Sequence, residues 1–158
     1  MPFKFSLEAV LDYRKRMEES RQRDFMQIQS EVDRIQSLLD QGRENYRQYQ
    51  RDLNRIAAEG KGYAHQKIYM DYLQGLERLM EKTQLHLDRL RAEAERRREL
   101  LEYALRQRRI MDELKKEEYK EYQLEERRAE TREFDEIAIR KFARQKEENF
   151  SRREDPIR

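Results

Sequence analysis

The chain has 158 residues, of which 44% are charged and 36% are hydrophobic, with four glycines, two prolines and neither tryptophan nor cysteine. This composition is typical of a long helix or a coiled coil. The 36 Lys and Arg against 34 Asp and Glu leave a formal charge of +2, which is too balanced for a protein dedicated to a polyanion such as nucleic acid. Without cysteine, disulfides and thiolate chemistry are excluded.

High charge also fits a disordered chain, but here the apolar residues recur at regular spacing, which favours helix. Proline occurs only at Pro2 and Pro156, so it interrupts nothing between them. No apolar run approaches the roughly 18 residues needed to cross a bilayer, and the first residues lack the layout of a signal peptide. We expect a cytoplasmic protein that inserts into no membrane and reaches one only through a partner.

One interior stretch, residues 57–63, interrupts the helical pattern. Its glycines, Gly60 and Gly62, each raise the cost of helix by about 1 kcal/mol relative to alanine. The chain is therefore predicted to turn there and form an all-α, antiparallel two-helix coiled-coil hairpin with unequal arms. We expect one elongated domain over 1–158, with helix 1 about 6–57, the tip about 58–63, helix 2 about 64–150, and then a frayed C-terminal tail.

The first arm carries one heptad seam. Its start resembles a helix N-terminus, with Ser6 as the N-cap and Phe5 stapled to Val10. The seam is apolar from Phe25 onward and charged at three earlier positions, which predicts tighter packing toward the tip. In chain order it reads Leu7, Leu11, Arg14, Glu18, Arg21, Phe25, Ile28, Val32, Ile35, Leu39, Gly42, Tyr46, Tyr49, Leu53 and Ile56.

The second arm continues the same 4-3 spacing beyond the tip. Folding the chain about residues 60 and 61 pairs positions whose numbers sum to about 121, which places Gly42 near Met80 and Tyr46 near Gly75. Each of the two glycines would then leave space for a large side chain opposite. The seam reads Tyr69, Leu73, Leu76, Met80, Thr83, Leu87, Leu90, Ala94, Arg97, Leu101, Ala104, Arg108 and Met111.

The pairing of the two arms cannot bury all of the apolar residues, and it leaves two apolar surfaces uncovered. Roughly the last thirty residues have no intramolecular partner, yet they carry a stripe at i, i+3, i+4 and i+8 that we interpret as a partner-binding surface. Near the tip, a ridge at i, i+4, i+7 and i+11 flanks the seam. This ridge is either a second binding surface or a broad core edge shielded by Tyr46 and Tyr49. The stripe is Phe134, Ile137, Ala138 and Phe142, and the ridge is Tyr72, Leu76, Leu79 and Thr83.

Residues that could perform chemistry are sparse. His65 and His86 are 21 positions apart and neither has a second histidine at i+4, so we expect no metal site. No glycine-rich loop suits a phosphate, and paired carboxylates lie on solvated helix. We expect no catalytic residues and no cofactor. The arginines near residues 96–109 alternate with glutamates, which favours i,i+4 pairs over RNA contacts and leaves RNA binding as a weak alternative.

Three segments together resemble the FliJ family of flagellar type III export proteins. The opening FKFSLEAVL, residues 3–11, resembles the family's aromatic and leucine-rich first turn. YMDYLQGLE, residues 69–77, resembles its region just after the tip, and FDEIAIR, residues 134–140, resembles its C-terminal hydrophobic-Asp-Glu motif. The likeness covers nearly the whole chain, and the order and spacing of the segments make it more specific than any one of them.

The resemblance implies a non-enzymatic stalk like that of rotary ATPases, which enters the hexameric ring of the flagellar export ATPase. It also implies contact with the cytoplasmic domain of the membrane export gate, an escorting role for export chaperones, and a location at the membrane of the flagellar base. By position, the gate-facing residues would be Tyr72, Leu76, Leu79 and Thr83, and the ATPase-facing residues Phe134, Asp135, Glu136, Ile137 and Arg140.

The chain is expected to be a monomer. The rival hypothesis is a homo-oligomeric coiled-coil scaffold or tether, in which the unpaired end of the second arm binds another copy.

Overall fold

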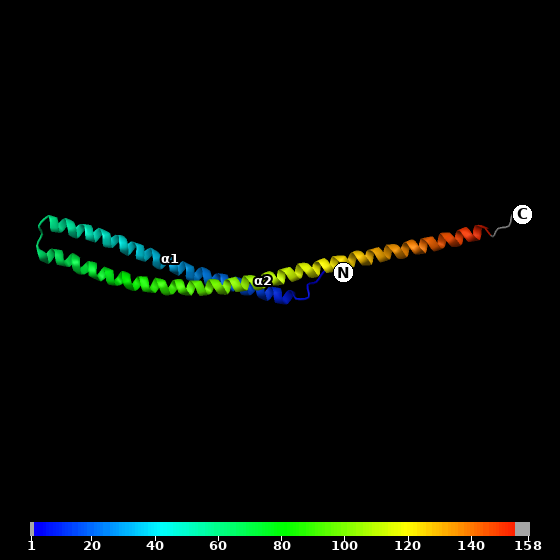
Figure 1. Ribbon diagram of the computed structural model, residues 1–158, viewed down its shortest axis with the longest axis horizontal. Coiled ribbons are helices and arrows are strands. Elements are labelled where there is room, and N and C mark those ends of the chain that lie inside the picture. Colours follow the sequence, from blue (N-terminus) through cyan, green and yellow to red (C-terminus); the bar gives the residue numbers. More distant parts are fainter. Residues whose placement is uncertain (1, 154–158) are drawn as a thin grey trace. The chain divides into compact units, whose positions relative to one another are not determined.

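The computed structural model describes residues 2–153 of the chain. The regular structure of these residues consists of two helices, α1 over Glu8–Ala58 and α2 over Tyr63–Arg153 (Figure 1). The prediction of an all-α hairpin of unequal arms is confirmed. The expected helix limits of 6–57 and 64–150 differ from the observed ones by one to three residues. The tail predicted after 150 is helical through Arg153, and its remainder lies outside the described residues.

The contacts divide the chain into two compact units. The first contains residues 12–108, and the second contains the described parts of residues 1–11 and 109–158. α2 contributes residues to both. The expectation of one domain over 1–158 stays a prediction. Between residues 2 and 153, no helix has the length and apolar character that crossing a membrane would need.

In the first unit, α1 and the beginning of α2 run side by side and antiparallel, joined by a turn at residues 59–62 (Figure 1). Gly60 adopts a φ of 72°. The amide of Gly60 donates to the Ala57 carbonyl at 3.2 Å, and the amide of Lys61 donates to the Ile56 carbonyl at 3.3 Å. These two bonds form a Schellman motif, which satisfies carbonyls at the end of α1 and requires the left-handed backbone that glycine tolerates. The predicted turn therefore depends on Gly60.

The core of this unit follows the two predicted seams. The most completely buried members, Leu39 and Leu87, are 2% and 1% exposed. Gly42 faces Met80 as predicted, since a Cβ at Gly42 would lie 3.5 Å from the Met80 Cγ. Gly75 does not face a large side chain as predicted, because nothing lies within 4 Å of a Cβ built there. Tyr46 instead reaches Glu77, two residues further along α2. The apolar cluster comprises Ile28, Val32, Ile35, Leu39, Leu87 and Ala94, with Phe25, Met80 and Leu90 packed against it.

Charged seam positions of the same unit are bridged between the helices. Glu18 forms an ion pair with Arg108, and both side chains are largely buried. Arg97 reaches across to donate to the backbone carbonyl of Asp24 at 3.1 Å. Specific polar contacts therefore replace apolar packing in the part of the seam that was predicted to be looser.

The second unit brings the first residues of the chain against α2. Phe5 is buried in a cluster with Leu11 and Met111, so it does not staple to the exposed Val10. The Ser6 hydroxyl donates to Glu118 at 2.8 Å. The predicted N-cap role of Ser6 is wrong, because α1 begins at Glu8 and the Leu7 carbonyl accepts the first i→i−4 hydrogen bond, so Ser6 lies before the cap position.

We call residues 124–153 of α2 the overhang. Every residue from 124 to 152 is exposed.

Candidate partner-binding surfaces

α1 and α2 together line a groove of about 570 Å³ within the first unit, and we call it the hairpin groove. All four residues of the predicted ridge lie in it, so the sequence-based ridge is one wall of a surface built by two helices. The other wall comes from α1. The lining residues are Ile35, Leu38, Leu39, Gln41, Gly42, Asn45, Tyr72, Leu76, Leu79, Met80, Lys82, Thr83 and His86.

The ridge combines two seam residues and two flanking ones. Leu76 and Thr83 are half-buried on the seam. Tyr72 and Leu79 each precede a seam position by one residue and are 44% and 60% exposed. The Thr83 hydroxyl donates to the Leu79 carbonyl at 2.8 Å. Its polar group is therefore satisfied within α2, which leaves this wall more apolar than the residue type suggests.

Whether the ridge is shielded from solvent depends on two tyrosines of α1, Tyr46 and Tyr49. The rings of Tyr49 and Tyr72 lie 4.2 Å apart between centroids, so Tyr49 covers part of Tyr72. The Tyr46 hydroxyl donates to Glu77 at 2.6 Å, and this hydrogen bond raises the pKa of Tyr46. Leu79 remains largely exposed beside these rings, so shielding of the ridge is incomplete.

The α1 wall of the groove was missed in the sequence. Leu38 and Asn45 are seven residues apart, as are Tyr72 and Leu79. In each helix these residues directly precede seam positions, and such flanking rows face one another on the same side of an antiparallel pair. Extending the heptad assignment to these rows would have found Leu38, which is 48% exposed.

The overhang presents its predicted residues on several sides of one helix. Phe134 and Phe142 are each 69% exposed, and Ile137 is 46% exposed. At about 100° per residue, Ile137 and Phe142 lie about 60° and 80° to either side of Phe134. Asp135 lies close to Phe142 at about 100°, and Glu136 lies on the far side at about 200°. Glu136 forms an ion pair with Arg140 at 3.5 Å. The five residues assigned to the ATPase are therefore adjacent but do not form one flat patch.

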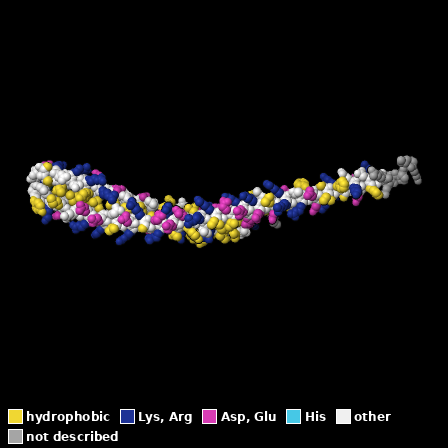
Figure 2. Space-filling model, viewed as in Figure 1, with side chains coloured by type: hydrophobic (Ala, Val, Ile, Leu, Met, Phe, Trp, Pro, Cys, Tyr) yellow, Lys and Arg dark blue, Asp and Glu magenta, His cyan; other side chains and the backbone are white. Residues whose placement is uncertain are grey.

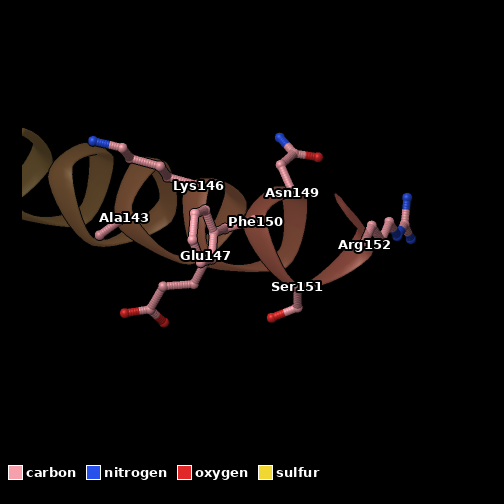
Figure 3. Close-up of a pocket in the computed structure, with 7 residues that line it drawn as sticks. All are labelled: Ala143, Lys146, Glu147, Asn149, Phe150, Ser151 and Arg152. Carbon is pink, nitrogen blue, oxygen red and sulfur yellow. The ribbon is translucent and has the colours of Figure 1, made fainter. Parts of the chain in front are cut away.

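The last described turns of α2 continue this exposure. In Figure 3 the labelled side chains, Phe150 and Arg152 among them, project from a single helix, and the view contains no second described element opposite them. The space beside Ala143 and Phe150 is therefore open surface. A partner that reached this part of α2 would contact a bare helix.

Charged side chains of both signs lie close together on the surface. Basic and acidic side chains are intermixed along the visible side (Figure 2). Hydrogen bonds from Arg96 and Arg97 lower the pKa of Glu93, and a hydrogen bond from Arg98 lowers the pKa of Glu95. Such pairs are screened at the surface and contribute little to stability. Over residues 2–153, no three His, Asp or Glu side chains gather closely enough to hold a metal ion.

The family model described as the flagellar FliJ protein matches residues 3–147. The chain belongs to the FliJ family. FliJ-family membership implies a role in flagellar export, in which this family is a non-catalytic component. The matched range contains the hairpin groove and residues Phe134–Arg140 of the overhang. No curated protein and no solved structure matches the chain.

Proposed function

We propose that this FliJ-family chain is a non-enzymatic stalk and adaptor of flagellar protein export. It couples the hexameric export ATPase to the cytoplasmic domain of the membrane export gate and escorts export chaperones. The observation that carries the proposal is the overhang, whose residues 124–152 are all exposed although they include large apolar side chains. A helix of this kind is stabilised when a partner covers it.

The overhang is assigned to the ATPase. Burial of each exposed Phe or Ile side chain contributes about 1.5–3 kcal/mol, so a partner that covers Phe134, Ile137 and Phe142 binds favourably even after ordering costs. Asp135, Glu136 and Arg140 add charged groups around the same turns, which gives the contact orientation. A ring that surrounds the helix fits residues distributed on several sides better than a single flat partner does.

The hairpin groove is assigned to the gate. Its ridge of Tyr72, Leu76, Leu79 and Thr83 offers apolar and aromatic anchors, and Asn45 and His86 supply polar groups at the edges. This mixture is typical of protein-binding hot spots. Through this contact the chain would be held at the cytoplasmic side of the membrane at the flagellar base.

Coupling needs no chemistry from the chain itself. α2 is one uninterrupted helix of 91 residues that carries residues of both surfaces. A partner that binds one surface more tightly in one conformational state biases the other partner through the shared helix, by no more than its difference in affinity between the states. The proposal therefore requires that the two surfaces be occupied at once.

The double variant Leu76→Ala with Leu79→Ala tests the gate contact. We expect affinity for the isolated gate domain to fall by about tenfold or more, while helicity by circular dichroism stays almost unchanged. Leu85→Ala is the matched control, because Leu85 is also 60% exposed but does not line the groove. Collapse of helicity would place Leu76 and Leu79 in the core, and unchanged affinity would reject the groove as the contact.

A homo-oligomeric scaffold is the second candidate, because the same exposed stripe could pair with another copy. Sedimentation separates the two functions. A monomer at all concentrations favours the stalk, and a concentration-dependent dimer or tetramer that dissociates on Phe134→Ala favours the tether.

A further inference from the structure

The first residues of the chain form a non-helical segment that lies against α2 in the second unit. We call this segment from residue 3 onward, together with Glu8 at the start of α1, the strap (residues 3–8), and residues 111–122 of α2 the overhang base. Phe3 inserts its ring beside two tyrosines of the base, with centroid distances of 5.1 Å to Tyr119 and 5.6 Å to Tyr122. The ring of Phe3 is edge-on to that of Tyr119, an arrangement that aromatic quadrupoles favour.

Polar contacts hold the strap in one register on the base. The Ser6 amide donates to Glu118 Oε1 at 3.0 Å, and the Ser6 hydroxyl donates to Glu118 Oε2 at 2.8 Å. Glu8 pairs with Lys115 at 2.7 Å. The ammonium of Lys115 also lies 5.8 Å from the centre of the Phe5 ring, within the range of a cation–π contact.

The strap provides the last tertiary contact before the overhang. Phe5 is buried with Leu11 and Met111, and Phe3 reaches Tyr122, whereas all residues from 124 to 152 are exposed. A helix without tertiary contacts depends on propensity and on local pairs, and it opens from its unsupported parts. The stability of the overhang base therefore depends on a few side chains that lie more than 100 residues away in sequence.

We propose that the strap is a conformational device that alternates between docked and released states and so sets the stiffness of the overhang base. Two of its contacts involve exposed side chains, Ser6 on the strap and Tyr119 on the base, so water can replace them at modest cost, as is typical of segments that open locally. When the strap is docked, its contacts brace the base by stabilising its helical conformation. When it is released, Tyr119, Tyr122 and Met111 lose their cover, and the base opens more often.

A consequence for export rests on the proposed function. If the overhang contacts the ATPase, a docked strap keeps the base of that helix formed, and a released strap lets the base open more often. Strap release then lowers stimulation of the ATPase without any change in the contact residues. The stiffness claim itself is independent of any partner.

Hydrogen exchange on the full chain tests the stiffness claim. The double variant Phe3→Ala with Ser6→Ala removes one ring and one hydroxyl donor, and we expect amides of residues 112–122 to exchange about tenfold faster. The exchange rates of amides near Leu87 should not change. Phe3→Tyr retains the ring and should restore protection, and Tyr63→Ala is the control, because Tyr63 is an exposed aromatic outside the strap.

A locked chain tests whether release occurs in the unmodified protein. The chain has no cysteine, so Ser6→Cys with Glu118→Cys introduces two unique thiols that a short thiol crosslinker joins. We expect exchange at residues 112–122 to become at least about threefold slower than in the uncrosslinked wild type, because release no longer contributes. Equal exchange in the locked and wild-type chains would overturn alternation, and unchanged exchange in the Phe3→Ala, Ser6→Ala variant would overturn bracing.

ATPase stimulation by the same variants separates this inference from the proposed function. Failure of the wild-type chain to stimulate the ATPase would refute the ATPase contact and leave the exchange results to decide the strap. Full stimulation by a strap variant whose base exchanges faster would overturn the link between stiffness and coupling.

Discussion

Leu87 and Phe142 occupy the same helix and are both large and apolar, yet Leu87 is 1% exposed and Phe142 is 69% exposed. The difference comes from α1, which packs against α2 around Leu87 and makes no described contact with the overhang. Apolar seam residues of the hairpin are covered by the facing helix, whereas the large apolar residues of the overhang are exposed. The first group stabilises the fold, and the second remains available to a partner.

The largest expected effect comes from opening the hairpin core. Leu87→Ala removes a fully buried side chain from the main cluster and should lower the free energy of unfolding by about 2–5 kcal/mol. Leu85→Ala, two residues away and 60% exposed, should change it by less than about 0.5 kcal/mol. Urea denaturation followed by circular dichroism measures both. Equal effects would mean that the seam does not determine which leucines are buried.

Ion pairs offer a second comparison between the two regions. Glu18 and Arg108 are paired on the seam with only 18% and 26% of their side chains exposed, whereas the Glu136–Arg140 pair of the overhang is 67% and 75% exposed. Glu18→Ala should therefore cost about 1 kcal/mol or more in unfolding free energy, and Glu136→Ala should leave it nearly unchanged. Thermal melts measure both variants, and equal melting temperatures would show that the seam pair is dispensable.

Two glycine substitutions should give the smallest changes in stability, and these two changes should have opposite signs. Gly60→Ala places a Cβ on a backbone with φ of 72° and should destabilise the hairpin by about 1 kcal/mol. Gly75→Ala meets open space inside a helix and should stabilise it by about 0.5–1 kcal/mol. Loss of stability in both variants would show that Gly75 has a packing role that its surroundings do not reveal.

The hairpin was predictable from sequence because heptad spacing is a local property. Gly60 marked the turn, and pairing about the tip correctly brought Gly42 to Met80. Prediction failed where side chains compete between segments distant in sequence. Ser6 looked like an N-cap because its neighbours suit one, but α1 begins at Glu8, beyond the reach of that role. The Ser6 hydroxyl instead donates to Glu118, and no local pattern encodes that partner.

The binding surfaces were only partly predictable. Leu79 and Phe134 could be selected because they exceed what a two-helix seam can bury. The α1 wall of the groove depends on a register between helices that the seam residues alone define only approximately. The strap contact between Phe3 and Tyr119 joins residues 116 positions apart, which periodicity within one helix does not reveal.

Stimulation of the export ATPase by a chain that ends at residue 125 tests the central claim most directly. The overhang contributes no residue to either apolar cluster, and its residues 124–152 are all exposed, so the shortened chain should unfold at nearly the same temperature and bind the gate domain as well as the full chain does. We predict that it does not stimulate the ATPase. Full stimulation by this shortened chain would contradict the assignment of the overhang as the ATPase-binding surface.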